Sequence, residues 1–153
     1  MAGYFENTTF GMTGISLSGN TAGTEIFAGA TVTKGSNKHA SAADAKGLDW
    51  GTDAGTFNLK LNFKVRTVSP ITYASTSADG TVTFKVYSSS DNATFKEVAS
   101  YTTTADALNA SKLKNNIVFS AVPTMGRYFC IGITTKTACT GGVLLVSCDP
   151  KGY

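Results

Sequence analysis

The side chains best suited to chemistry in this sequence are one histidine, three cysteines and a group of aspartates. His39 is the single histidine, and it lies in the loop-like stretch 35–41. A nucleophilic serine needs a histidine base, and no G-x-S-x-G elbow or strand–turn–helix pattern is present to hold one. The pattern therefore indicates a loop histidine, and we expect the protein not to be an enzyme.

The cysteines and aspartates are of metal-ligand type but lack the spacing of metal sites. Cys130, Cys139 and Cys148 fit no zinc pattern, and no second histidine completes one. Their odd number favours free thiols, although the sequence leaves open whether any two are paired. The acidic group consists of Asp44, Asp49 and Asp53. It lacks the alternating ligands and final glutamate of an EF-hand, so turn-forming aspartates are favoured over a loose calcium site. We therefore expect no metal and no cofactor.

Composition narrows the class of protein further. The chain has 153 residues, the size of one domain, with 15% charged residues and a net charge of +3. Lysines and arginines occur singly, whereas nucleic-acid binding needs them clustered. No apolar run approaches the roughly 20 residues that span a bilayer, and Met1–Glu6 lacks the features of a signal peptide. We expect no nucleic-acid or membrane partner, and synthesis in a cytoplasm.

Strict alternation of apolar and polar residues predicts β-strands. The clearest case is the segment 57–66, in which every second residue is apolar from Phe57 to Val65. Further strands are predicted at 81–88, 98–101, 117–122, 127–134 and 143–147. Helical periodicity is almost absent, and 105–113 is interpreted as a turn or a single helical turn. Short strands separated by turn signals predict one all-β antiparallel sandwich or barrel.

Two predicted strands are apolar on both faces, which indicates that something covers them. They are 127–134 and 143–147, and the cover is either a neighbouring subunit or a loop or N-terminal arm of the same chain. We divide the chain into an arm with a possible first strand, 1–30, and a sandwich domain, 31–153. The arm residues predicted to dock on a partner protein or on a sister subunit are Tyr4, Phe5, Phe10 and Met12. The residues predicted to form the subunit contact are Tyr128, Leu144 and Val146.

Ordered pieces between residues 48 and 147 carry a family likeness. A strand runs into a Ser/Asp loop over 82–95, a later strand ends at Val122-Pro123, and Gly126-Arg127-Tyr128 leads into an apolar strand. A Gly141-Gly142 turn precedes the last strand. In this order of pieces the chain resembles the Bordetella-phage-type capsid cement (decoration) proteins.

The resemblance implies a jelly-roll-like β-sandwich that forms a homotrimer. It further implies synthesis in a host bacterium and binding to the major capsid protein on the outer surface of a phage head, with no catalytic residues to transfer. Two alternatives stay open. One is a carbohydrate-binding jelly roll that uses Trp50, Tyr73 or Tyr101, and the other is a different virion structural subunit such as a tail protein.

Overall fold

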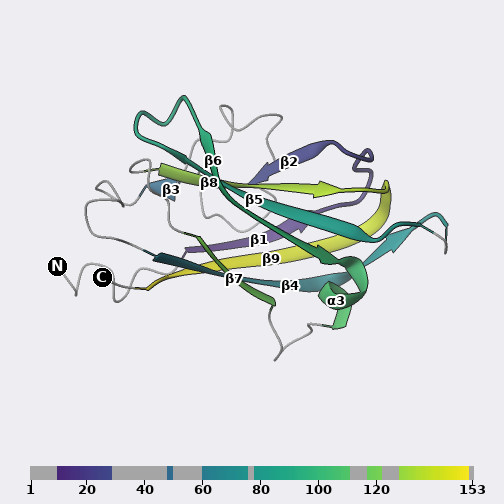
Figure 1. Ribbon diagram of the computed structural model, residues 1–153. Helices are drawn as coiled ribbons and strands as arrows, with labels where there is room; N and C mark the ends of the chain where they lie inside the picture. The colour runs from purple at the N-terminus through teal and green to yellow at the C-terminus, as the bar shows by residue number, and fades with distance from the viewer. Residues whose placement is uncertain are drawn as a thin grey trace.

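The computed structural model describes residues 10–28, 48–49, 60–75, 78–110, 117–121 and 128–151. Two antiparallel sheets face one another (Figure 1). Sheet A contains, in spatial order, β1 (Phe10–Ser16), β9 (Cys139–Lys151), β4 (Lys60–Tyr73) and β7 (Ile117–Ala121). Sheet B contains β2 (Glu25–Ala28), β8 (Tyr128–Thr135), β5 (Thr81–Ser89) and β6 (Lys96–Thr104), with β3 (Leu48–Asp49) also paired to β8. This architecture confirms the predicted all-β antiparallel sandwich.

The chain winds back and forth between the two sheets. β1 lies in sheet A, β2 in sheet B, β4 in sheet A, β5 and β6 in sheet B, β7 in sheet A, β8 in sheet B and β9 in sheet A. The first strand therefore pairs with the last, β1 with β9, and the ends of the described chain meet in one sheet. Most neighbouring strands are distant in sequence, so the sheets hold the whole chain together.

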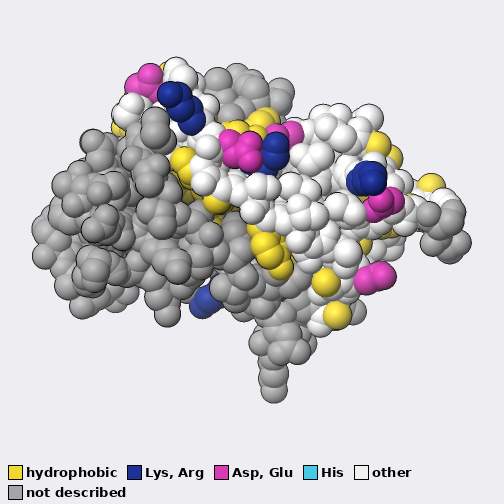
Figure 2. All heavy atoms as spheres, in the orientation of Figure 1, with side chains coloured by type: hydrophobic (Ala, Val, Ile, Leu, Met, Phe, Trp, Pro, Cys, Tyr) yellow, Lys and Arg dark blue, Asp and Glu magenta, His cyan; other side chains and the backbone are white. Residues whose placement is uncertain are grey.

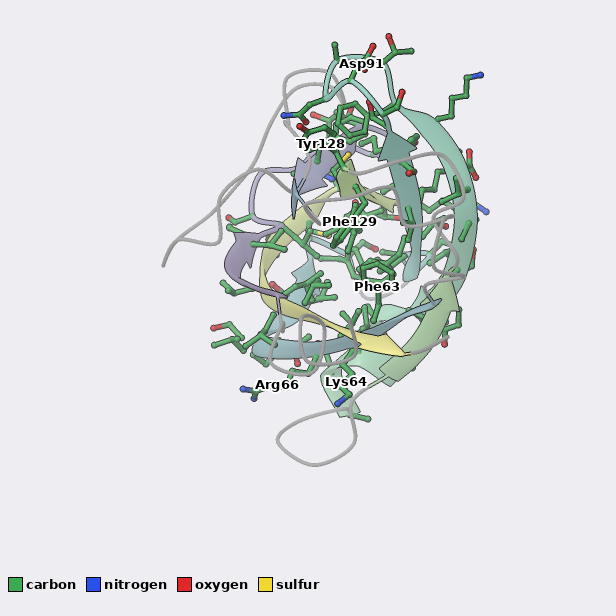
Figure 3. All side chains as sticks on the ribbon, turned by 90° about the vertical axis from the view of Figure 1, so that its left-hand side faces the viewer. Phe63, Lys64, Arg66, Asp91, Tyr128 and Phe129 are labelled. Atoms are coloured by element: carbon green, nitrogen blue, oxygen red, sulfur yellow. The ribbon has the colours of Figure 1, made fainter. Side chains whose placement is uncertain are left out.

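The core lies between the sheets because inward and outward residues alternate along each strand. On β5, Val82, Phe84 and Val86 are fully buried, while the residues between them are partly exposed. Phe63 of β4 meets Phe129 of β8 edge to face, with ring centroids 6.0 Å apart (Figure 3). Each such side chain contributes about 1.5–3 kcal/mol on burial.

The short helix α3 (Ala105–Ala110) confirms the single helical turn predicted in this region. Thr104 Oγ1 accepts a hydrogen bond from Ala107 N at 3.1 Å, which caps the helix. Leu108 is buried in the core, and its carbonyl accepts a hydrogen bond from Thr67 Oγ1 at 3.2 Å. The helix is thereby fixed against β4.

Strand β4 is longer than the sequence predicts, since the stretch around Pro70 reads as a turn. The strand continues to Tyr73 through register shifts after Thr67. Pro70 has no N–H to donate, and the side chain of Asn109 binds the next residue instead. Ile71 N donates to Asn109 Oδ1 at 2.8 Å, and Asn109 Nδ2 donates to Ile71 O at 3.0 Å. A helix residue thus supplies the pairing that keeps this part of β4 extended.

The described part of the predicted arm, residues 10–28, belongs to the sandwich itself. It supplies β1 to sheet A and β2 to sheet B. Ile15 and Leu17 are fully buried, and Leu17 N donates to Gly142 O at 2.8 Å. The boundary predicted at residue 30 therefore does not separate an arm from the domain over these residues. The possible first strand at Ile15 is confirmed.

Candidate functional site

Two of the residues predicted to contact a neighbouring subunit lie in the core instead. Leu144 and Val146 are both 0% exposed and pack between the sheets of their own chain. Alternation along β9 turns their neighbours, Val143 and Leu145, toward the outside, where both are half-buried. The predicted role of Leu144 and Val146 is therefore wrong. Both faces of this strand are apolar, so the sequence pattern does not distinguish them, and the two predicted residues lie on the inward face. Tyr128 is half-buried at the start of β8, and its predicted role stays a prediction.

The predicted docking residues fall at the beginning of the chain. Tyr4 and Phe5 lie outside the described residues. Phe10 and Met12 lie in β1, an edge strand of sheet A, opposite Cys148 and Val146 of β9. Their docking role is not tested by this placement and stays a prediction.

The candidates for metal or acid–base chemistry do not assemble into a site within the described ranges. His39, Asp44 and Asp53 lie outside these ranges, and Asp49 lies in β3. No group of three or more histidine, cysteine, aspartate or glutamate side chains comes together among the described residues. Free or loosely clustered polar side chains of this kind carry no argument for catalysis.

Cys130 and Cys139 are free thiols, and both are buried. Burial and, to a smaller extent, the nearby Glu25 carboxylate raise the pKa of the Cys130 thiol from 9.0 to about 12. Because the thiolate is the reactive form, Cys130 is chemically inert at neutral pH. Cys148 lies in β9, opposite Phe63 of β4.

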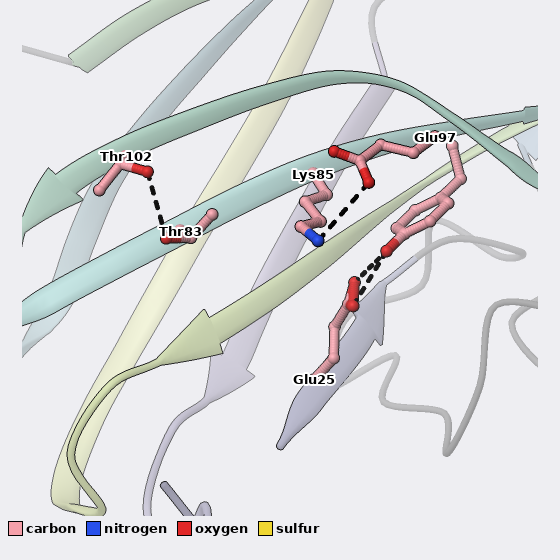
Figure 4. A network of polar contacts seen from close by, with 6 residues as sticks. Glu25, Thr83, Lys85, Glu97 and Thr102 are labelled. Atoms are coloured by element: carbon pink, nitrogen blue, oxygen red, sulfur yellow. Dashed lines mark hydrogen bonds and ion pairs between the residues drawn. The ribbon is translucent and has the colours of Figure 1, made fainter. Parts of the chain in front are cut away.

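The outer face of sheet B is closed by contacts among its own side chains (Figure 4). The Tyr87 hydroxyl donates to the Glu25 carboxylate, 2.5 and 2.9 Å from its two oxygens. Burial and Glu25 together raise the pKa of Tyr87. Beside this pair, Lys85 lies 3.5 Å from Glu97. Further along, the hydroxyls of Thr83 and Thr102 are 3.2 Å apart.

A glycine on the central strand makes the Tyr87–Glu25 contact possible. Glu25 projects from β2 and Tyr87 from β5, and β8 lies between these two strands. A β-carbon at Gly132 of β8 would overlap the Glu25 carboxylate. Gly132 therefore lets Glu25 cross β8 and reach the tyrosine.

A small apolar cluster on the outer face of sheet B shows what covers the second apolar face of β8. Cys130, on the outward face of β8, packs with Phe27, Tyr87 and Phe95. The rings of Phe27 and Tyr87 are tilted, with centroids 5.5 Å apart. Phe27 comes from the N-terminal region, and Phe95 follows the loop after β5. Here the second apolar face of β8 is covered by the same chain rather than by a neighbour.

The outer face of sheet A has a different character. Lys64 and Arg66 of β4 point away from the core, on the side opposite to Phe63 (Figure 3). Val68 is 57% exposed, the one exposed large hydrophobic among the described side chains. Leu145 lies opposite Arg66 in the β4–β9 ladder, and Val143 is two residues before it. We call these five residues, Lys64, Arg66, Val68, Val143 and Leu145, the β4–β9 face.

The charges of the β4–β9 face are all positive. Among the described residues Arg66 has no ion-pair partner, whereas Lys85 on sheet B is paired with Glu97. On the face of the molecule seen in Figure 2, the described charged side chains are few and form no broad basic patch. The face thus combines half-exposed aliphatic groups with two cations, a composition suited to contact with an acidic protein surface.

The tyrosines predicted to stack on sugars are not exposed platforms. Tyr73 and Tyr101 are partly buried and pack against the main core. Trp50 lies outside the described residues. Burial raises the pKa of Tyr73 to about 12. Neither tyrosine is therefore the exposed stacking platform that the sequence predicts.

Comparison with known proteins returned no relative: the chain matches no protein-family model, no curated protein and no solved structure. Within the described ranges, no helix has the length and hydrophobicity to cross a membrane. What the protein does must therefore be inferred from the geometry of its surfaces.

Proposed function

We propose that this protein decorates the outside of a bacteriophage capsid and docks on the major capsid protein through the β4–β9 face. The observation that carries the proposal is the contrast between the two outer faces. The polar groups of sheet B bind one another, whereas the β4–β9 face presents Val68, Val143 and Leu145 beside two cations. A shell surface with carboxylates around an apolar patch would complement it.

The strand order supports the jelly-roll arrangement that the proposal implies. Strands that alternate between two sheets, with the first beside the last, wind as two interlocked Greek keys. Capsid-associated proteins commonly use this architecture. The resemblance noted in the sequence is the second support, and it covers residues 48–147, from β3 into β9.

Charge decides which kind of partner fits the β4–β9 face. A two-fold contact of this face with itself would set Lys64 and Arg66 against their own copies, and like charges would repel. Arg66, which has no ion-pair partner among the described residues, would instead complement a different, acidic surface. We propose that the sister subunits of a homotrimer meet through other surfaces and leave the β4–β9 face toward the shell.

Trimeric attachment would convert modest single contacts into firm binding. Linking several equivalent contacts raises apparent affinity by about 10²–10⁴. A protein that binds the assembled shell more tightly than free capsid subunits stabilises the shell by mass action. Such a role needs rigidity and position rather than catalysis.

Binding to empty heads of the same phage tests the proposal. Purified protein is incubated with heads assembled from the major capsid protein, and the bound fraction is measured by sedimentation. Val68→Asp combined with Arg66→Glu is expected to lower affinity at least about tenfold, or 1.4 kcal/mol. Ser100→Asp, which adds a carboxylate to the exposed outer side of β6, is the matched control and should bind normally.

Other outcomes would overturn the proposal or part of it. Wild-type protein that does not bind heads contradicts the capsid role, and binding to tails would favour the alternative of a tail subunit. Equal binding by the double variant and wild type removes the β4–β9 face from the docking surface. Electron microscopy of decorated heads tests the trimer separately, since single, isolated copies on the shell would contradict it.

A further inference from the structure

A cavity of about 410 Å³ lies at one end of the sandwich, and its lining includes none of the five residues of the β4–β9 face. It is formed where β4 ends, β5 begins and β6 passes into α3 (Figure 1). Ile71, Tyr73 and Ala105 supply its apolar lining. Small-molecule sites in proteins have volumes of about 300–1,000 Å³. The cavity is thus large enough for a small ligand.

The polar lining of the cavity is held in place before any ligand arrives. Asp79 Oδ1 accepts hydrogen bonds from Thr81 N at 3.0 Å and Thr81 Oγ1 at 2.6 Å. Lys136 Nζ lies 2.9 Å from the other carboxylate oxygen. Thr81 and then Lys136 lower the pKa of Asp79 to about 2, so the carboxylate is ionised at neutral pH. Ala105 N donates to Gly80 O at 2.7 Å, which fixes the turn against α3.

The charges at the cavity determine which chemistry it accepts. Asp79 is already balanced by Lys136, and the exposed Asp106 adds one further carboxylate. An anionic ligand would be repelled by Asp106. A metal ion would find too few ligands, because no cluster of three ligating side chains occurs in the described part of the chain. A neutral ligand rich in hydroxyl groups meets neither obstacle.

We infer that this cavity binds a neutral saccharide. Thr81 Oγ1 donates to Asp79 and keeps a lone pair, while Thr104 Oγ1 accepts from Ala107 N and keeps a proton to donate. The carboxylates of Asp79 and Asp106 have further acceptor sites. Sugar hydroxyls match that mixture, while the Tyr73 ring and Ile71 cover the apolar C–H surface of a pyranose. The inference is independent of capsid docking, since no residue of the β4–β9 face lines the cavity. A shell decorated with this protein would display one such site on each copy.

Titration of isotope-labelled, full-length protein with monosaccharides tests the inference. Glucose, galactose, mannose and N-acetylglucosamine are added separately at millimolar concentrations, and backbone amide shifts are followed by NMR. At least one sugar is expected to shift the amides of Gly80, Thr81 and Asp106 with a millimolar Kd. Absence of a saturable shift at these amides with all four sugars would overturn the inference.

Two variants separate binding in the cavity from binding elsewhere. Gly80→Val should abolish the shifts, because a side chain at this position points at Ala105 Cβ and Tyr73 Cε2, 3.5 and 3.8 Å from its β-carbon. Asp106→Asn should weaken binding about tenfold without disturbing the fold, since Asp106 is exposed. Glu97→Gln, on the outer face of sheet B, is the control and should leave binding unchanged. If Gly80→Val does not fold, Asp106→Asn decides, and unchanged affinity in it would overturn the assignment.

Discussion

The two outer faces of this sandwich are built on the same strand geometry but differ in what their side chains contact. On sheet B, Tyr87 binds Glu25, and Lys85 pairs with Glu97. On sheet A, Arg66 has no such partner among the described residues, and Val68 is more than half exposed. Sheet B completes its own contacts, whereas in the described part of sheet A Val68 stays exposed and Arg66 has no ion-pair partner.

The two faces differ because a segment of the same chain covers the outside of sheet B. The short edge strand β2 supplies both Glu25 and Phe27 to the outside of sheet B, where they cover β8. Gly132 gives Glu25 the space to do so. An apolar residue on an outward face is therefore evidence for a partner only after contacts within the chain have been accounted for.

The largest effect on stability is expected for Leu144, on the inner face of sheet A, in comparison with its neighbour Leu145 on the outer face. Leu144→Asp buries a carboxylate without a partner and should destabilise the fold by at least about 4 kcal/mol. Leu145→Asp, with Arg66 opposite it, should change stability by less than about 1 kcal/mol and reduce head binding. Urea unfolding and head sedimentation measure the two effects. A folded, soluble monomer in Leu144→Asp would restore the subunit contact at that residue.

The next effect tests whether sheet B depends on its own polar contacts. Tyr87→Phe removes the donor to a partly buried Glu25 carboxylate and should lower the free energy of unfolding by about 1–2 kcal/mol. Gly132→Ala should act in the same direction by displacing Glu25. Thr102→Val, at an exposed pair, is the control, with an expected change below about 0.5 kcal/mol. If the stability lost in the double variant equals the sum of the losses in Tyr87→Phe and Gly132→Ala, the two substitutions do not act through one contact.

Alkaline pH should weaken the outer cluster of sheet B first. The folded-state pKa of Cys130 is raised from 9.0 to about 12, so its stabilising contribution is full below pH 9 and is lost as pH rises toward 12. Unfolding measured from pH 7 upward should show a decline that begins near pH 9. In Cys130→Ala the decline should begin nearer pH 10, the ordinary pKa of tyrosine. A thiol reagent that labels Cys130 rapidly in the native protein at pH 8 would contradict this burial.

The smallest effect on stability is expected when one surface cation is removed from each of the two outer faces. Lys85→Gln and Arg66→Gln each remove one surface cation, and each should change the free energy of unfolding by no more than about 0.5–1 kcal/mol. Only Arg66→Gln should weaken binding to heads and reduce its dependence on salt. Equal loss of head binding in both variants would mean that net charge, not the β4–β9 face, attracts the shell.

Much of the fold could be predicted because alternation is local. Val82, Phe84 and Val86 identify both β5 and its inward face, since polar residues occupy the positions between them. The same rule fails for Leu144 and Leu145, because both faces of that strand are apolar. It also misses the end of β4, where the pairing of Ile71 depends on Asn109, 38 residues away.

The surfaces were less predictable than the strands. The residues of the β4–β9 face are ordinary strand residues in sequence. The lack of an ion-pair partner for Arg66 among the described residues becomes visible only in the folded sheet. The sequence also does not predict that Tyr73, Asp79 and Asp106 line one cavity, since they come from three separate segments of the chain. Of these three residues, the sequence predicts a binding role for Tyr73 alone, as an exposed stacking residue, and Tyr73 is instead partly buried against the core.

By itself, the sequence determined that the protein is an all-β antiparallel sandwich, since alternation and turn residues act over a few positions. Tertiary structure alone decided which of Leu144 and Leu145 is buried, how Cys130 is covered, and that Asp79 and Asp106 line one cavity. Each of these depends on strands that are distant in the chain and become neighbours only when the two sheets close over the core. Burial and pairing across sheets are properties of that closure, and no local pattern encodes them.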